Sequence, residues 1–86
     1  MATVSERVKE VTGRVLKVDV SQIKDEHSFT VDLGASSVQS VELVASFEEE
    51  FEIEMEEDAA LSVESVGKAI EFIAATCKEQ GIEVEL

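Results

Sequence analysis

Proline is missing from this 86-residue sequence, as are tryptophan, tyrosine and any run rich in glycine and serine. Because flexible linkers between domains are usually built from such runs, we expect residues 1–86 to form a single domain. The aromatic residues are four phenylalanines, and most other apolar residues are small and aliphatic. This composition favours an all-α fold whose core is built mainly from small side chains.

Long apolar runs are also absent. A helix that crosses a bilayer needs about 20 consecutive apolar residues, and no apolar run in the sequence approaches that length. The first ten residues, MATVSERVKE, lack the apolar centre of a secretory signal peptide. We therefore expect no membrane insertion and a cytoplasmic location.

Side chains that commonly catalyse reactions or bind metals are scarce. The single cysteine, Cys77, excludes an internal disulfide and a cysteine-based zinc site, and we expect a partly buried thiol rather than a nucleophile. The single histidine, His27, lies in a predicted loop, where a solvated side chain is the simplest interpretation. The acidic run over residues 48–58 lacks the alternating ligands and central glycine of a calcium loop. We predict no metal site and no enzyme active site.

Basic residues are few and unevenly placed. Seven Lys and Arg stand against twenty Asp and Glu, which gives a formal net charge of −13 at pH 7. The sequence between Lys24 and Lys68 contains no Lys or Arg. A surface with one sign of charge repels nucleic acid and attracts basic proteins. The alternative is that these charges only keep a small domain soluble.

Helical periodicity is clear in three segments. Apolar residues recur three and four positions apart over residues 4–16, 37–51 and 65–78, which predicts three longer helices. Gly13 weakens the first of these predictions, because glycine is a poor helix former. The N-cap candidates are Thr3 or Ser5 for the first helix and Ser62 or Ser65 for the last.

The segments between these helices carry weaker signals. Residues 17–35 form a long loop, and we expect its own apolar side chains to hold it against the core: Ile23, Phe29 and Leu33. Alternation in FEIEM and in the C-terminal GIEVEL is typical of strands, but facing glutamates would repel across such a pair. We therefore predict an extended loop, a short helical turn over residues 57–61, and a frayed C-terminal tail.

The start of the helix over residues 37–51 is unusually well marked. Ser36 followed by Gln39 fits a capping box, in which each side chain bonds to the backbone of the other residue. Ser37 is then the first helical residue and lies beside the unsatisfied N–H groups at the positive end of the helix dipole. A phosphodiester would be favoured there. The alternative is that both serines are capping residues and nothing more.

The same helix carries apolar residues on two sides. Its predicted core face holds Leu43, Val44, Phe47 and Phe51. A flank of the helix holds Val38, Val41 and Ala45, bordered by the carboxylates of Glu42, Glu48, Glu49 and Glu52. The helix thus has more apolar surface than a core needs, and carboxylates without basic neighbours surround this surface. Such a combination is typical of a helix that docks onto another protein.

The segment DLGASSVQSVELVASFEEEFEIEM, residues 32–55, resembles the signature of the acyl carrier protein family. That signature usually reads D-L-G-x-D-S-L, followed by an apolar and acidic helix that ends in E-E-E-F or a close relative. SERVKEV resembles the family's first helix, SFTVDLG the end of its long first loop, and SVESVGKAIEFI its last helix. The resemblance implies a four-helix bundle with a short third helix and a long first loop. It also implies a free-standing carrier that is not itself an enzyme.

The resemblance further implies roles for individual residues. Ser37 aligns with the serine that receives 4′-phosphopantetheine from coenzyme A through a phosphopantetheinyl transferase, and Ser36 is the second choice. This arm carries acyl groups as thioesters. Docking onto basic-surfaced acyl-transfer and synthase enzymes would use Val38, Val41 and Ala45 together with Glu42, Glu48 and Glu49. An interior acyl cavity would be lined by Leu43, Phe47, Ile53, Ala60, Val63 and Ile70. We expect the carrier to be a monomer.

The chain departs from the family pattern beside the modified serine. SSV stands where the family has DSL, so that Ser36 replaces the aspartate used by the transferase and Val38 replaces leucine. Ala45 is smaller than the usual apolar residue, and Glu56 replaces a common proline. These departures favour a specialised carrier with its own partner enzymes, and the resemblance implies that it serves fatty acid or related lipid biosynthesis. The alternatives are a carrier for polyketide, peptide or D-alanyl transfer, and an unmodified acidic interaction module.

The net charge of −13 predicts that the fold is sensitive to salt. The screening length falls from about 30 Å at 0.01 M salt to about 3 Å at 1 M, so that added salt weakens repulsion among the carboxylates. We expect the melting temperature to rise with added NaCl or divalent cations, as followed by circular dichroism. A melting temperature that does not change with salt would contradict this account.

Overall fold

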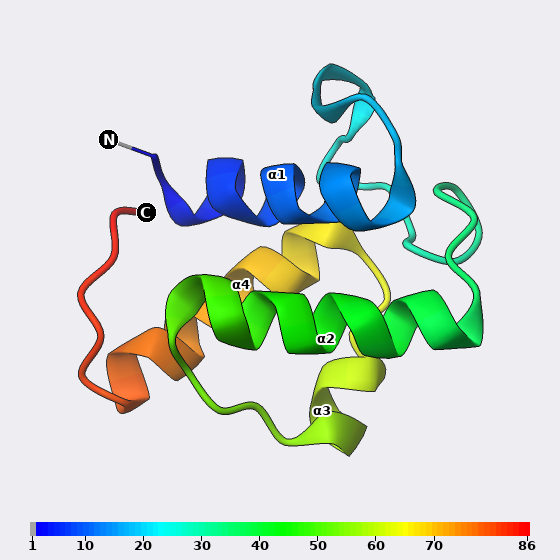
Figure 1. Ribbon diagram of the computed structural model, residues 1–86. Coiled ribbons are helices and arrows are strands. Elements are labelled where there is room, and N and C mark those ends of the chain that lie inside the picture. The colour runs from blue at the N-terminus through cyan, green and yellow to red at the C-terminus, as the bar shows by residue number, and fades with distance from the viewer. Residues whose placement is uncertain (1) are drawn as a thin grey trace.

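The computed structural model describes residues 2–86, which form helices joined by irregular segments (Figure 1). The elements are α1 (Val4–Leu16), the 3₁₀ turn η1 (Val20–Gln22), α2 (Ser37–Phe51), α3 (Glu57–Leu61) and α4 (Val66–Glu79). α1 packs against α2 and α4, and α2 also packs against α3. Within the described residues no strand forms: in FEIEM, Phe51 ends α2 and the residues from 52 to 56 are a turn and an irregular loop. The all-α fold, the short third helix and the long first loop are confirmed.

The core lies where three helices bring their apolar faces together. α1 contributes Val4, Val8 and Val11, each almost fully buried and spaced by three or four residues. α2 contributes Leu43, Phe47 and Phe51, and α4 contributes Val66, Ala69, Ile73 and Cys77. Thr12 is also buried, and its hydroxyl donates a 2.8 Å hydrogen bond to the carbonyl of Val8. On the core face predicted for α2, Leu43, Phe47 and Phe51 are buried and Val44 is half-buried.

The first loop is held by side chains and by its backbone. Ile23 and Phe29 are buried and Leu33 is half-buried, as predicted. The carbonyls of Asp25 and His27 accept hydrogen bonds from Gly67 N–H at 2.8 Å and Val66 N–H at 3.0 Å. The loop thus satisfies N–H groups at the start of α4 that have no partner within their own helix.

His27 lies in the first loop, as predicted, and makes one local hydrogen bond. Its side chain is half-buried, and its Nδ1 accepts a 3.1 Å hydrogen bond from the backbone N–H of Lys24. The position of His27 in a loop agrees with the prediction, and its ring in addition closes the turn over residues 24–27. This is a structural role.

The prediction of a frayed C-terminal tail is wrong. Figure 1 shows the C-terminal tail returning to the start of α1. Ile82 and Val84 pack against the core, and the carbonyl of Glu85 accepts a 2.7 Å hydrogen bond from Val4 N–H. The alternation in GIEVEL therefore marks a segment with one face on the core, although no strand pairs with it in residues 2–86.

Cys77 is fully buried rather than partly buried. Burial raises the pKa of its thiol, since the thiolate would lose its hydration, and the charge of Arg7 opposes this effect. A buried thiol with a raised pKa is a poor nucleophile, in agreement with the expectation that Cys77 is a packing residue.

Gly13 is required by a close approach of the chain. A Cβ atom added at this position would lie 2.9 Å from the carbonyl oxygen of Val18 and 2.9 Å from Cγ2 of Val20. These distances are shorter than van der Waals contact. Gly13, which weakens the prediction of this helix from the sequence, is therefore the residue that lets the first loop fold back over α1.

We predict that Gly13→Ala destabilises the protein, by up to about 2 kcal/mol. Helix propensity favours alanine by about 1 kcal/mol, but overpacking typically costs about 1–3 kcal/mol. The measurement is urea unfolding. The matched control compares Glu10→Gly with Glu10→Ala at an exposed position of the same helix. There the alanine variant should be more stable than the glycine variant. Stabilisation by Gly13→Ala would show that the loop moves aside without strain.

Candidate functional site

The start of α2 is fixed by a capping box and by the turn before it. Ser36 Oγ accepts a 3.1 Å hydrogen bond from Gln39 N–H, and Gln39 Oε1 accepts a 3.1 Å hydrogen bond from Ser36 N–H. In the preceding turn, Asp32 Oδ2 accepts from Ser28 N–H at 2.7 Å, and Gly34 adopts a left-handed conformation with φ of +72°. The predicted capping box is confirmed.

Ser37 is the first residue of α2, and its side chain is exposed. Its hydroxyl forms no hydrogen bond with any residue from 2 to 86, whereas the Ser36 hydroxyl is engaged in the cap. The Ser37 oxygen therefore lies at the positive end of the helix dipole with its lone pairs and proton available. The two adjacent serines have different environments.

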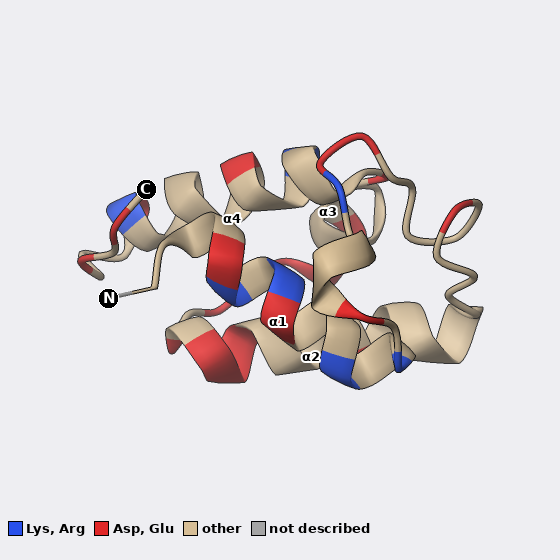
Figure 2. Ribbon diagram, turned by 90° about the horizontal axis from the view of Figure 1, so that it is seen from above, with Lys and Arg blue, Asp and Glu red and all other residues tan. Residues whose placement is uncertain are grey.

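The predicted apolar flank of α2 is exposed. Val38 and Val41 have 69% and 46% of their surface accessible, and Ala45 is exposed as well. Glu42 and Glu49 are exposed beside them, and Figure 2 shows a red, acidic stretch at the C-terminal end of α2. α2 itself contains no Lys or Arg. The surface thus combines apolar and acidic character, and its use in docking stays a prediction.

Two carboxylates of α2 are engaged within the chain. Glu50 pairs with Arg7, whose Nε lies 2.8 Å from Glu50 Oε2 and whose guanidinium carbon lies 4.3 Å from the centre of the Phe51 ring. Glu48 is half-buried, and its Oε2 accepts a 2.9 Å hydrogen bond from Met55 N–H. Glu48, which the sequence placed among the docking carboxylates, therefore also holds the loop after α2.

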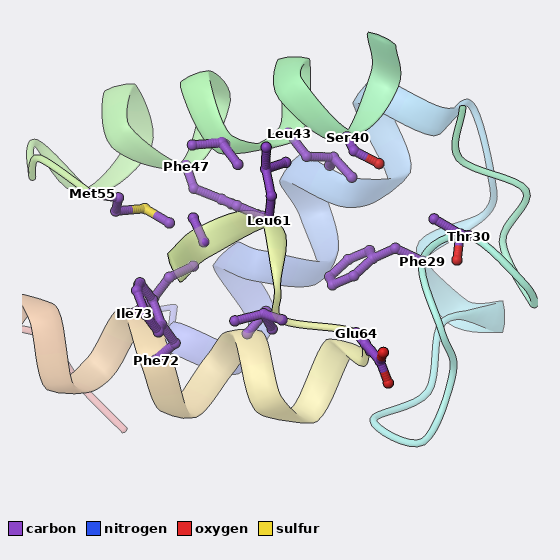
Figure 3. Close-up of a pocket in the computed structure, with 14 residues that line it drawn as sticks. Phe29, Thr30, Ser40, Leu43, Phe47, Met55, Leu61, Glu64, Phe72 and Ile73 are labelled. Carbon is purple, nitrogen blue, oxygen red and sulfur yellow. The ribbon is translucent and has the colours of Figure 1, made fainter. Parts of the chain in front are cut away.

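A cavity of about 230 Å³ lies between α2, α3 and α4 (Figure 3). Of the residues predicted to line it, four do so: Leu43, Phe47, Ala60 and Val63. The predicted lining by Ile53 and Ile70 is wrong. Ile53 is buried in the core, and Ile70 lies beside the face of α4 that turns Ala69, Phe72 and Ile73 toward the cavity.

Several lining residues were not assigned to a cavity from the sequence. Phe29 was predicted only to hold the first loop, and Met55 only to be part of an extended segment, yet Figure 3 shows both side chains at the cavity. Polar side chains from three different segments lie toward one end of the cavity: Thr30, Ser40 and Glu64. Ser40 lies one helical turn beyond Ser37, so that this polar end is close to the start of α2.

Comparison with known proteins shows the family. The family model described as phosphopantetheine attachment site matches residues 6–73. An acyl carrier protein of Sinorhizobium fredii (strain NGR234) is 47% identical over 73 residues, which cover 85% of this chain and 94% of the relative. Acyl carrier protein AcpP of Rhizobium meliloti shows the same identity and coverage. The chain belongs to the acyl carrier protein family. Its resemblance to that family, stated from the sequence, is confirmed.

Membership in the acyl carrier protein family defines the general role of the chain. It is a carrier and not an enzyme, and its cofactor is a covalently bound 4′-phosphopantetheine. Its partners are a phosphopantetheinyl transferase and enzymes that handle acyl groups. Over residues 2–86, no helix is long and apolar enough to cross a membrane.

The residues at the start of α2 fit such a cofactor. A phosphodiester needs an accessible hydroxyl and tolerates a helix N-terminus well, and Ser37 offers both. The cavity between α2, α3 and α4 offers an apolar space nearby. No group of three side chains suited to hold a metal ion occurs in the part of the chain that the structure describes.

The capping geometry predicts a difference between the two serines. Ser36→Ala removes the side-chain acceptor of Gln39 N–H and should destabilise the protein by about 1 kcal/mol. Ser37→Ala removes an exposed hydroxyl without partners and should change the stability by less than about 0.5 kcal/mol. Urea unfolding of the two variants measures this difference. Equal losses of stability would contradict the assignment of Ser36 as the N-cap.

Proposed function

We propose that this chain carries acyl groups as thioesters on a 4′-phosphopantetheine arm attached to Ser37, in fatty acid or related lipid biosynthesis. The observation that carries the proposal is the exposed Ser37 hydroxyl at the capped start of α2, in a chain of the acyl carrier protein family. The arm, when attached, supplies a terminal thiol that holds the acyl group. The residues of the chain position that arm and receive partner enzymes.

Ser37 is preferred over Ser36 because of its hydrogen bonding. Modification of Ser36 would place a phosphodiester on the oxygen that accepts from Gln39 N–H, and would thus remove the cap of α2. Modification of Ser37 leaves the cap intact. The N–H groups of the first turn are then available to the phosphate oxygens.

The cavity supports the carriage of an apolar chain. An apolar cavity of about 150 Å³ holds one benzene molecule, so that by this scale 230 Å³ has room for roughly nine carbon atoms. Its inner walls are apolar, from Leu43, Phe47 and Ile73. Sheltering the chain from water would be favourable by about 0.8 kcal/mol for each methylene buried.

Docking would use the exposed flank of α2. Val38 and Val41 offer apolar contact, while Glu42 and Glu49 attract basic residues on a transferase or synthase surface. Glu48 and Ala45 complete this surface. Attraction between exposed charges speeds association and is weakened by salt, so that the carrier can move quickly from one enzyme to the next.

The motif SSV, in place of DSL, supports a specialised carrier with its own partner enzymes. Without the aspartate, the transferase lacks one negative group beside the serine, which would slow modification or favour a dedicated transferase. We further propose that residues 1–86 act as one carrier domain, as a monomer and in the cytoplasm. A carrier for polyketide, peptide or D-alanyl transfer is the second candidate, since the acidic flank and the arm would serve it equally well.

The proposal predicts which serine gains mass. After incubation with coenzyme A and a broad-specificity phosphopantetheinyl transferase, the intact mass of the wild-type chain should increase by one phosphopantetheine. Ser36→Ala should still gain this mass, and Ser37→Ala should not. Mass spectrometry of the three proteins is the measurement.

The pattern of the three masses tests each part of the proposal. Modification lost only in Ser36→Ala would move the attachment site by one residue. A wild-type chain that no transferase modifies, including those of organisms that encode close relatives, would favour an unmodified interaction module.

A further inference from the structure

The last part of the first loop presents one apolar side chain to solvent. Phe29 and Ala35, at the two ends of this part, are buried in the core. Val31 points the other way, with 83% of its surface accessible. Among the larger apolar side chains of residues 2–86, only Leu86 is as exposed. A single exposed valine is common on protein surfaces, so that its surroundings decide whether it has a use.

Hydrogen bonds hold the turn that carries Val31. Ser28 Oγ accepts a 3.2 Å hydrogen bond from Val31 N–H, and the carbonyl of Ser28 accepts from the N–H groups of Asp32 and Leu33, both at 3.1 Å. The Asp32 carboxylate in turn accepts from Ser28 N–H at 2.7 Å. Val31 is therefore held outward before any partner binds. Its burial by a partner would cost little conformational entropy.

The turn lies close to the site serine. The carbonyl of Phe29 accepts a 2.8 Å hydrogen bond from Ala35 N–H, which closes the turn two positions before Ser37. Figure 1 and Figure 2 both show this turn beside the start of α2. Val38, the residue after Ser37, has 69% of its surface accessible. Exposed apolar side chains from two separate segments thus lie near one exposed hydroxyl.

The chemistry at Ser37 indicates which partner covers this surface. An enzyme that acts on the acyl group meets it at the far end of a flexible arm, and needs no contact with the surroundings of Ser37. The phosphopantetheinyl transferase instead acts on the hydroxyl itself. The Ser37 oxygen forms a bond to the β-phosphorus of coenzyme A, the pyrophosphate bond breaks, adenosine 3′,5′-bisphosphate leaves, and the hydroxyl proton passes to a base on the enzyme. This enzyme must cover the residues around Ser37.

We propose that Val31 is a contact residue for the phosphopantetheinyl transferase and is not used by the enzymes that act on the acyl group. The inference rests on the proposed function in taking Ser37 as the attachment site. Ser36 is neutral, so that the residue before the site offers the transferase no charge. An apolar contact from the first loop adds binding free energy at the same place, and salt does not screen it.

The test measures the rate of modification of the arm-free chain with coenzyme A and a transferase. Val31→Ser removes the apolar side chain and should raise KM for the chain about fivefold or more. The value of kcat should not change, because the contact is remote from the reacting atoms and is the same before and during the reaction. Val31→Ile keeps an apolar side chain and should restore the wild-type KM.

Leu86→Ser is the matched control. Leu86 is as exposed as Val31, and the C-terminus lies at the opposite end of the molecule from the start of α2 in Figure 1 and Figure 2. This variant should be modified with the wild-type KM. Circular dichroism verifies that each variant is folded, and the ratio of KM between Val31→Ser and wild type should be the same at low and high salt.

A second readout separates the transferase from the other partners. Wild type and Val31→Ser are first loaded fully with the arm by a long incubation with excess transferase. An acyltransferase then transfers an acyl group from acyl-coenzyme A to the thiol of the arm. Its KM should be the same for the two loaded proteins, because it reaches the thiol through the arm.

Each outcome decides a different point. An unchanged KM for modification of Val31→Ser, or an equal rise for Leu86→Ser, would overturn the inference and leave Ser37 as the attachment site. A rise for Val31→Ser in both reactions would show that the contact is general and not specific to the transferase. A wild-type chain that gains no arm would contradict the proposed function and this inference together.

Discussion

α2 is buried on one side only, and the rest of the structure depends on this. Leu43, Phe47 and Phe51 pack into the core, while Val38 and Val41 face solvent because no other helix of residues 2–86 covers them. The inner face therefore closes the core and the cavity, and the outer face stays available to other proteins. Burial of the outer face by another helix would stabilise the domain and remove its predicted docking surface.

The capping box gives this helix a defined starting point. The Ser36–Gln39 pair fixes where α2 begins, and the left-handed Gly34 and the bond between Asp32 and Ser28 N–H fix the direction from which the chain arrives. Ser37 thus has a rigid helix beneath it and solvent above it. A reactive hydroxyl on a rigid support can be presented to an enzyme with little loss of conformational entropy.

Local patterns predicted most of the architecture. Helix ranges, the capping box and the exposed flank follow from spacing and cap chemistry that are visible within a few residues, as for Ser36 and Gln39. The errors concern contacts outside the regular helices. The bond from Val4 N–H to Glu85, the approach of Val18 to Gly13 and the bond from Met55 N–H to Glu48 use single backbone groups, which leave no periodic signal in the sequence. Ile53 was misassigned because the left-handed turn at Glu52 redirects the chain before it.

The acidic residues at the end of α2 give a physical reason why this end of the helix would attract a basic partner. The C-terminal end of a helix carries a partial negative charge, so that each nearby carboxylate is unfavourable by about 0.3–1 kcal/mol. α2 ends with Glu48, Glu49 and Glu50 and has no basic residue in its last turn; Arg7 from α1 offsets only Glu50. The unpartnered domain therefore keeps a local repulsion at the place where the loop toward the cavity begins. A partner that supplies positive charge relieves this repulsion, and part of the binding free energy then comes from the carrier itself.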